Sequence, residues 1–185
     1  PIDGDPSKTK WVLQVSINDG APAGGSGMQY FVGTFDGKTF KNENPSDQVL
    51  WTDYGADYYA AVDWSGIEGK NGEKYWIGWM SNWQYAQQVP TEKWRSAMTI
   101  PRTLRLESAG GKLYLASEPV AEMAAIKNKS IKLSDVSWNK DLAATHLRNA
   151  AGLFQLNFTA NANEDFVVLL SNSDAREVLI GYDAN

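Results

Sequence analysis

Apolar positions in the first part of the chain fall into short runs of strand length. Residues 11–17 read WVLQVSI, and residues 29–35 read QYFVGTF, in which rings alternate with small residues. Runs of this kind, bounded by Gly, Pro and Asp, are typical of strands. Between them lies the glycine-rich loop NDGAPAGGSG, residues 18–27, and the Asp36-Gly37 step that follows has the chemistry of a tight hairpin turn. The pattern therefore predicts a strand, a loop and a strand pair.

A second strand pair follows in the same style. Residues 57–64 read DYYAAVDW and residues 74–83 read KYWIGWMSNW, joined through the turn-rich GIEGKNGE. Side chains alternate between the two faces of a strand. With strict alternation, one face of the first run carries Tyr59, Ala61 and Asp63, and its other face carries Tyr58, Ala60, Val62 and Trp64. One face of the second run carries Tyr75, Ile77, Trp79, Ser81 and Trp83. No helical period precedes residue 85, so we predict an all-β architecture such as a propeller or barrel.

The residue composition of the chain changes near residue 119. Before it, TLRLES and KLYLASEP form another alternating hairpin, and after it the residues are smaller and more polar. Three later runs with polar turns between them predict strands, at residues 153–160, 165–172 and 177–183. We expect a domain junction here, with residues 119–185 forming the start of a β-sandwich.

The predicted architecture is unfinished. A closed propeller usually has at least about four blades of four strands, whereas the first ~118 residues supply strands for roughly two. Sheets that do not close expose edges that pair or aggregate. We therefore expect the chain to be one piece of a larger assembly.

Composition narrows the range of partners. The formal net charge is −5 and Lys and Arg are not clustered, so neither a nucleic acid nor an anionic membrane is expected as a partner. The absence of cysteine excludes disulfides and thiolate metal sites, and the single histidine, His146, gives little support to a metal site or a Ser-His-Asp triad. No apolar run approaches ~18 residues, so no membrane span is expected. The first ten residues, PIDGDPSKTK, lack the apolar core of a signal peptide, so if the protein is secreted we expect its signal peptide upstream of them.

Residues 53–102 hold five of the eight tryptophans, interleaved with polar side chains. Sugars present apolar C–H faces and polar hydroxyl edges, so their sites pair an aromatic plate with Asp, Asn or Arg. We expect Tyr59 and Trp83 to supply the plate and Asp57 to contact the substrate. Asn18 either supplies an amide at the mouth of the glycine-rich loop or serves as a turn residue. The tryptophans assigned to the core are Trp64, Trp76, Trp79 and Trp94.

Four motifs in this order carry a family resemblance: SINDGAPAGGSGMQYFVGTFDGKTF, DYGADYYAAVDW, IGWMSNWQYA and VPTEKWRSAMTIPRTL. Together they resemble glycoside hydrolase family 32, the levanases, exo-inulinases and invertases that cleave β-fructosides, over nearly all of residues 8–119. The resemblance implies a five-bladed β-propeller followed by a β-sandwich, and a retaining reaction without a metal or other cofactor. It identifies residues 1–118 as the last propeller blades and residues 119–185 as the start of the sandwich.

The same resemblance implies that this chain contains no catalytic residue. The family's nucleophile lies in a WMNDPNG-like motif, its transition-state-stabilising aspartate in RDP and its acid/base glutamate in an EC motif. None of these occurs here, because Gly4 precedes Asp5-Pro6 and there is no cysteine. The family's EC motif normally falls shortly before a segment like DGDPSKTKWVL. Tyr59 and Trp83 match positions that line the fructose subsite, and Asn18 and Asp57 match positions near its leaving-group side.

We therefore expect part of a secreted or extracytoplasmic exo-β-fructosidase acting on levan, inulin or sucrose. Its other partner would be the N-terminal propeller portion of the same protein, and these 185 residues would be inactive alone. The alternative from another class is a non-catalytic carbohydrate-binding module whose aromatics form a lectin-like platform. A third possibility is a purely structural β fragment.

Overall fold

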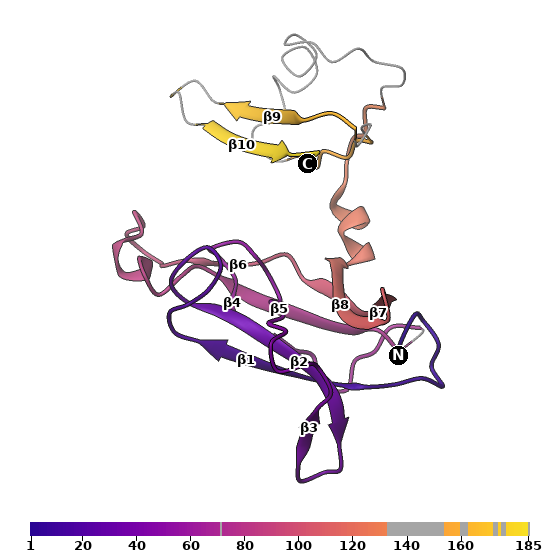
Figure 1. Cartoon of the computed structure of the whole chain (residues 1–185). Helices are drawn as coiled ribbons and strands as arrows, with labels where there is room; N and C mark the ends of the chain where they lie inside the picture. The colour runs from indigo at the N-terminus through magenta and orange to yellow at the C-terminus, as the bar shows by residue number, and fades with distance from the viewer. Residues whose placement is uncertain (71, 133–153, 160–162, 172–173, 175–176, 185) are drawn as a thin grey trace. The chain divides into compact units, whose positions relative to one another are not determined.

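The computed structural model describes residues 1–70, 72–132, 154–159, 163–171, 174 and 177–184, and the chain forms two compact units, Pro1–Asn128 and Lys129–Asn185. Within the described residues, every regular element is a strand except two short 3-10 helices (Figure 1). The prediction of an all-β fold is therefore confirmed.

The first unit begins with an antiparallel sheet of three strands. They are β1 (Trp11–Ile17), β2 (Gly27–Phe35) and β3 (Phe40–Asn42), in the order β1-β2-β3. The predicted hairpin turn joins β2 to β3, where the Asp36 carboxylate accepts hydrogen bonds from the backbone N–H groups of Lys38 at 2.8 Å and Thr39 at 2.7 Å. Gly37 at φ +92° takes the left-handed position that such a turn requires.

The second sheet of this unit has five strands. Its main path is β4-β5-β7-β8, and β6 pairs with β5. The strands are β4 (Tyr59–Asp63), β5 (Lys74–Met80), β6 (Ala97–Met98), β7 (Arg102–Ala109) and β8 (Lys112–Pro119). The two 3-10 helices are η1 (Ala86–Gln88), which lies between β5 and β6, and η2 (Ala121–Ile126), which follows β8.

A bulge in β4 changes which side chains face the core. The β4–β5 register shifts between Tyr59 and Val62, and Ala60 adopts φ +49°. The extra residue turns Ala61 to the side of Tyr58, so both are buried. The predicted face shared by Tyr59 and Ala61 is therefore wrong. The freed N–H of Ala61 donates to the Met28 sulfur at 3.1 Å.

The core of the first unit joins its two sheets through β2. One cluster contains Met28, Tyr58, Ala61 and Trp76, and the other contains Tyr30, Val32, Leu50 and Leu106. Because Met28, Tyr30 and Val32 alternate along β2, one face of this strand covers the second sheet. The Tyr30 hydroxyl also accepts a hydrogen bond from the Leu115 backbone N–H at 3.0 Å.

The predicted tryptophan core is only partly correct. Trp76 is 2% exposed and lies in the core, as predicted, and Trp79 is half-buried. The prediction is wrong for Trp64 and Trp94, which are 38% and 67% exposed, since Trp64 lies beyond the end of β4 and Trp94 lies in the connection between η1 and β6.

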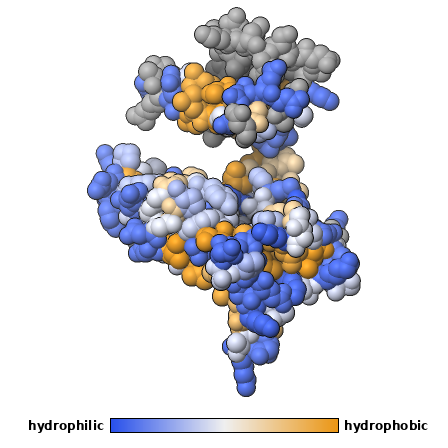
Figure 2. All heavy atoms as spheres, in the orientation of Figure 1, coloured by the Kyte–Doolittle hydropathy of each residue, from blue (hydrophilic) through white to orange (hydrophobic). Residues whose placement is uncertain are grey.

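Hydrophobic side chains also reach the surface of the first unit along β1 (Figure 2). Trp11, Leu13 and Val15 alternate on the face of β1 turned away from the core, and Trp11 packs edge-on against Phe35 with ring centroids 5.3 Å apart. These three residues form an outer apolar face of β1.

The second unit contains an antiparallel pair of strands in its described residues. β9 (Phe166–Ser171) pairs with β10 (Glu177–Tyr182), and the rings of Phe166 and Tyr182 stack at 5.3 Å. The strand predicted at residues 153–160 is not formed over 154–159, where no described strand pairs with the backbone. The assignment of residues 119–185 to the start of a β-sandwich stays a prediction.

Gly78 offers a test of the core. A Cβ on Gly78 would lie 2.8 Å from Cε2 of the buried Tyr58 ring, so Gly78→Ala should destabilise the first unit by about 1–3 kcal/mol. The measurement is the denaturant midpoint followed by tryptophan fluorescence. Gly181→Ala in β10 is the control, because its nearest non-neighbouring atom lies at 3.9 Å. Equal midpoints for wild type and Gly78→Ala would contradict this packing.

Candidate functional site

Three rings from neighbouring segments form a continuous aromatic row, Tyr59, Trp79 and Trp83. Tyr59 pairs across the sheet with Trp79, and their ring centroids lie 6.2 Å apart in an edge-to-face arrangement. Trp79 and Trp83 are tilted against each other at 5.1 Å. Trp83 is 50% exposed, whereas Tyr59 and Trp79 are half-buried. The two predicted plate residues are thus linked by Trp79, a residue assigned to the core from the sequence.

Tyr58 anchors the start of β4 and thereby turns the residue before it, Asp57, outward. Its ring is 2% exposed, and the Arg102 guanidinium lies over it, 4.5 Å from the centroid. Arg102 is held in turn by Asp53 through a 2.8 Å ion pair. Burial raises the pKa of the Tyr58 hydroxyl, which keeps it neutral. Because side chains alternate, a buried Tyr58 turns Asp57 out to the surface, while the half-buried Tyr59 packs against the margin of the core cluster.

Asp57 is exposed, and the Tyr85 hydroxyl donates a hydrogen bond to its Oδ1. Desolvation, followed by the hydrogen bond to the Asp57 carboxylate, raises the pKa of Tyr85 to about 12. Among the hydrogen bonds of the described residues, none reaches the other carboxylate oxygen, Oδ2. Asp57 can therefore accept a hydrogen bond from a ligand hydroxyl while Tyr85 fixes its orientation.

A fully buried carboxamide, that of Asn82, joins the segments around this row. Its Oδ1 accepts from the backbone N–H groups of Ser26 at 3.1 Å and Gln84 at 2.9 Å. Its Nδ2 donates to the carbonyls of Ala56 at 2.8 Å, Gly24 at 3.0 Å and Ser26 at 3.2 Å. The glycine-rich loop, the connection before β4 and the turn after β5 therefore meet on one side chain.

The glycine-rich loop approaches Asn82 so closely that only glycine fits at residue 25. A Cβ there would lie 2.1 Å from the Asn82 Oδ1, and Gly25 adopts φ +65°. The next residue, Ser26, accepts a hydrogen bond on its Oγ from the backbone N–H of Trp83 at 3.1 Å. The loop thus holds the backbone of the exposed tryptophan.

The fourth predicted residue, Asn18, lies apart from this network. It is exposed and follows Ile17, which pairs with Gly27 at the other end of the loop. No hydrogen bond between described residues joins its side chain to Asp57, Tyr59 or Trp83.

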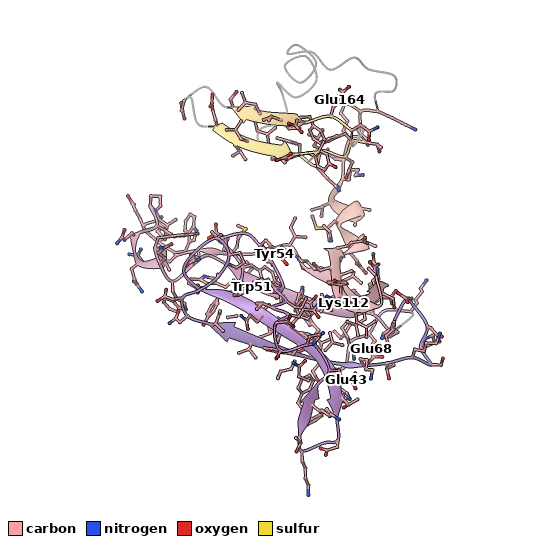
Figure 3. The ribbon with its side chains drawn as sticks, in the orientation of Figure 1. Glu43, Trp51, Tyr54, Glu68, Lys112 and Glu164 are labelled. Atoms are coloured by element: carbon pink, nitrogen blue, oxygen red, sulfur yellow. The ribbon has the colours of Figure 1, made fainter. Side chains whose placement is uncertain are left out.

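A further exposed aromatic side chain, Tyr54, lies in the connection before β4 and is labelled in Figure 3. Its side chain is 68% exposed.

Sequence reasoning missed the supporting residues Ser26, Asn82 and Tyr85. The Gly24-Gly25 pair signalled a close backbone approach, but nothing in the sequence spacing indicated which side chain it approaches. Tyr85 lies 28 positions from Asp57, beyond any local pattern.

The described residues contain no group of three His, Cys, Asp or Glu side chains able to hold a metal ion. Among the same residues, no helix is long and apolar enough to cross a membrane.

Comparison with known proteins identifies relatives of one family. Residues 1–117 match the sequence model described as Glycosyl hydrolases family 32 N-terminal domain. A levanase of Bacillus subtilis is 54% identical over 137 residues, which cover 74% of this chain and 20% of the levanase. An extracellular exo-inulinase of Aspergillus niger is 36% identical over 195 residues, 99% of this chain and 36% of the inulinase. The chain thus spans between a fifth and just over a third of the length of these relatives.

Solved structures of similar enzymes also match this chain. The crystal structure of an exo-inulinase from Aspergillus awamori matches with a TM-score of 0.62 and 42% identity, over 70% of this chain and 26% of the inulinase. A fructofuranosidase variant from Schwanniomyces occidentalis, complexed with fructosylnystose, matches with a TM-score of 0.68 and 29% identity, over 99% of this chain and 38% of that enzyme.

The raised pKa of Tyr85 predicts a loss of stability in alkali. A tyrosine whose pKa is higher in the folded state stabilises the fold below pH about 10 and loses this contribution as the pH rises towards about 12. Phenylalanine cannot ionise. From roughly pH 9 to roughly pH 11.5, a range that includes the ordinary tyrosine pKa of about 10, the free energy of unfolding should therefore fall less in Tyr85→Phe than in wild type. Denaturant titrations at both pH values measure this difference.

Asp57→Asn is the second variant, because it removes the charge but keeps the Tyr85 ring. Its fall in stability should lie between those of wild type and Tyr85→Phe. Identical pH dependence in all three proteins would rule out the Tyr85–Asp57 interaction.

Proposed function

Because the chain belongs to glycoside hydrolase family 32, we propose that the whole protein is a retaining exo-β-fructosidase that hydrolyses levan, inulin or sucrose. The relatives named levanase and exo-inulinase support this substrate class. The observation that carries the proposal for this chain is the aromatic row together with Asp57, which lies two positions before Tyr59 and whose Oδ2 accepts no hydrogen bond from the described residues.

In such a reaction one carboxylate attacks the anomeric carbon of fructose while a carboxylic acid protonates the departing oxygen, and water then releases the sugar. The family motifs for these carboxylates are missing from residues 1–185. The role proposed for this chain is therefore substrate binding. Trp83 and Tyr59 shape the fructose subsite, and Asp57 and Asn18 hold hydroxyl groups towards the leaving-group side.

The proposed partner of the first unit is the N-terminal propeller portion of the same protein. The outer face of β1, with Trp11, Leu13 and Val15 between 37% and 57% exposed, supports this proposal because regular apolar faces are normally buried against another sheet. We further propose that the protein is secreted, in line with relatives described as extracellular.

Removal of the exposed ring tests the binding role. In the whole protein, Trp83→Ala should lower kcat/KM for sucrose and levan about three- to tenfold, the value of one aromatic contact. Trp64→Ala, an exposed tryptophan outside the aromatic row, is the matched control and should retain wild-type kinetics. An unchanged kcat/KM in Trp83→Ala would refute the role of this plate.

The 185-residue chain alone should release no fructose from sucrose, inulin or levan, because the family's reactive carboxylates are missing from it. Reducing-sugar assays measure the release, and calorimetry with fructo-oligosaccharides measures binding. Release of fructose by the purified chain would contradict the proposal. Binding by a whole protein that releases no fructose would instead favour a carbohydrate-binding module.

A further inference from the structure

Asn82 is the side chain through which the three segments of the candidate site meet. It is 0% exposed and all of its hydrogen-bond partners are backbone groups. A residue that never meets solvent cannot touch a dissolved sugar, so any contribution to binding must come from the placement of other side chains.

The hydrogen-bonding pattern requires a carboxamide. Two backbone N–H groups point at Oδ1, and three carbonyls surround Nδ2, whose two hydrogens are shared among them. An aspartate at this position would keep both acceptor contacts and lose every donor contact. It would also set a negative charge against three carbonyl oxygens. Aliphatic residues would leave all five contacts unmade.

A short series of contacts connects the buried amide to the exposed ring. Asn82 holds both the N–H and the carbonyl of Ser26, and the Ser26 hydroxyl accepts from the Trp83 N–H at 3.1 Å. On the other side, Asn82 holds the carbonyl of Ala56, the residue before Asp57. The plate and the carboxylate are therefore placed by the same amide.

We propose that Asn82 is a positioning residue for carbohydrate binding, which sets Trp83 and Asp57 relative to each other through Ser26 and Ala56. The part concerning the ligand rests on the proposed function. The part concerning Trp83 does not, because the Trp79–Trp83 contact lies within the chain itself and is followed without any sugar.

Two variants of the whole protein interrupt this series at different points. Asn82→Asp removes the donor contacts, whereas Ser26→Ala removes only the hydroxyl that holds the Trp83 N–H. For sucrose we expect KM to rise about tenfold in Asn82→Asp and about threefold in Ser26→Ala, with kcat changed by less than about twofold. A residue that only stabilised the fold would alter the amount of active enzyme and leave KM unchanged.

A spectroscopic readout follows Trp83 directly. Two indoles at 5.1 Å couple their transitions and give a circular-dichroism couplet, which Trp83→Phe assigns by removing it. The couplet should weaken in Asn82→Asp and Ser26→Ala. Ser81→Ala is the matched control, because Ser81 is also buried and adjoins Asn82, but its hydroxyl makes no hydrogen bond to any described residue. It should keep the wild-type KM and couplet.

The outcomes separate the two proposals. A raised KM and a weakened couplet in Ser26→Ala, with Ser81→Ala unchanged, support the positioning role. A wild-type KM and couplet in Ser26→Ala overturn it, even if Asn82→Asp fails to fold. If the whole protein cleaves no β-fructoside, the proposed function fails, and the couplet alone then decides the placement of Trp83: its loss in Ser26→Ala supports the positioning role and its retention overturns it.

Discussion

The candidate site depends on one constraint: the Asn82 carboxamide is fully buried, so its two donor hydrogens and its acceptor oxygen must be satisfied by the five backbone groups around it. Each such hydrogen bond contributes about 0.5–1.5 kcal/mol net, but a buried group left unpaired costs about 1–3 kcal/mol. This asymmetry makes the arrangement nearly all-or-none, because moving one segment leaves polar groups of the others unsatisfied. Three connections that would each be mobile alone are thereby held as a unit.

A second constraint acts on the strand beside it. Tyr58 is packed between the Gly78 backbone and the Arg102 guanidinium, and its burial decides that Asp57 points outward. The bulge at Ala60 then restores core packing with Ala61. Exposed side chains of the site are thus fixed by buried neighbours one residue away.

Local patterns in the sequence predicted the strands and the Asp36-Gly37 hairpin, because both follow from nearest-neighbour chemistry. They failed at Ala61, since a bulge with a non-glycine residue at positive φ leaves no compositional mark. They also misassigned Trp64 and Trp94, because periodicity does not say whether a face is covered. Over residues 154–159 the expected strand is not formed for a related reason, since a strand needs a partner as well as a pattern and no described strand pairs there.

The site itself shows where single-sequence reasoning stops. Tyr59 and Trp83 were proposed as the aromatic plate from residue type and from the family resemblance, and the structure links their two rings through Trp79. Asn82 has no such mark: its partners at Ser26 and Ala56 lie 56 and 26 positions away. A buried amide in the sequence looks like any other asparagine, and only the fold shows that it faces backbone on every side. The residues proposed to contact a ligand therefore carry a signal in the sequence, whereas those that hold them in place do not.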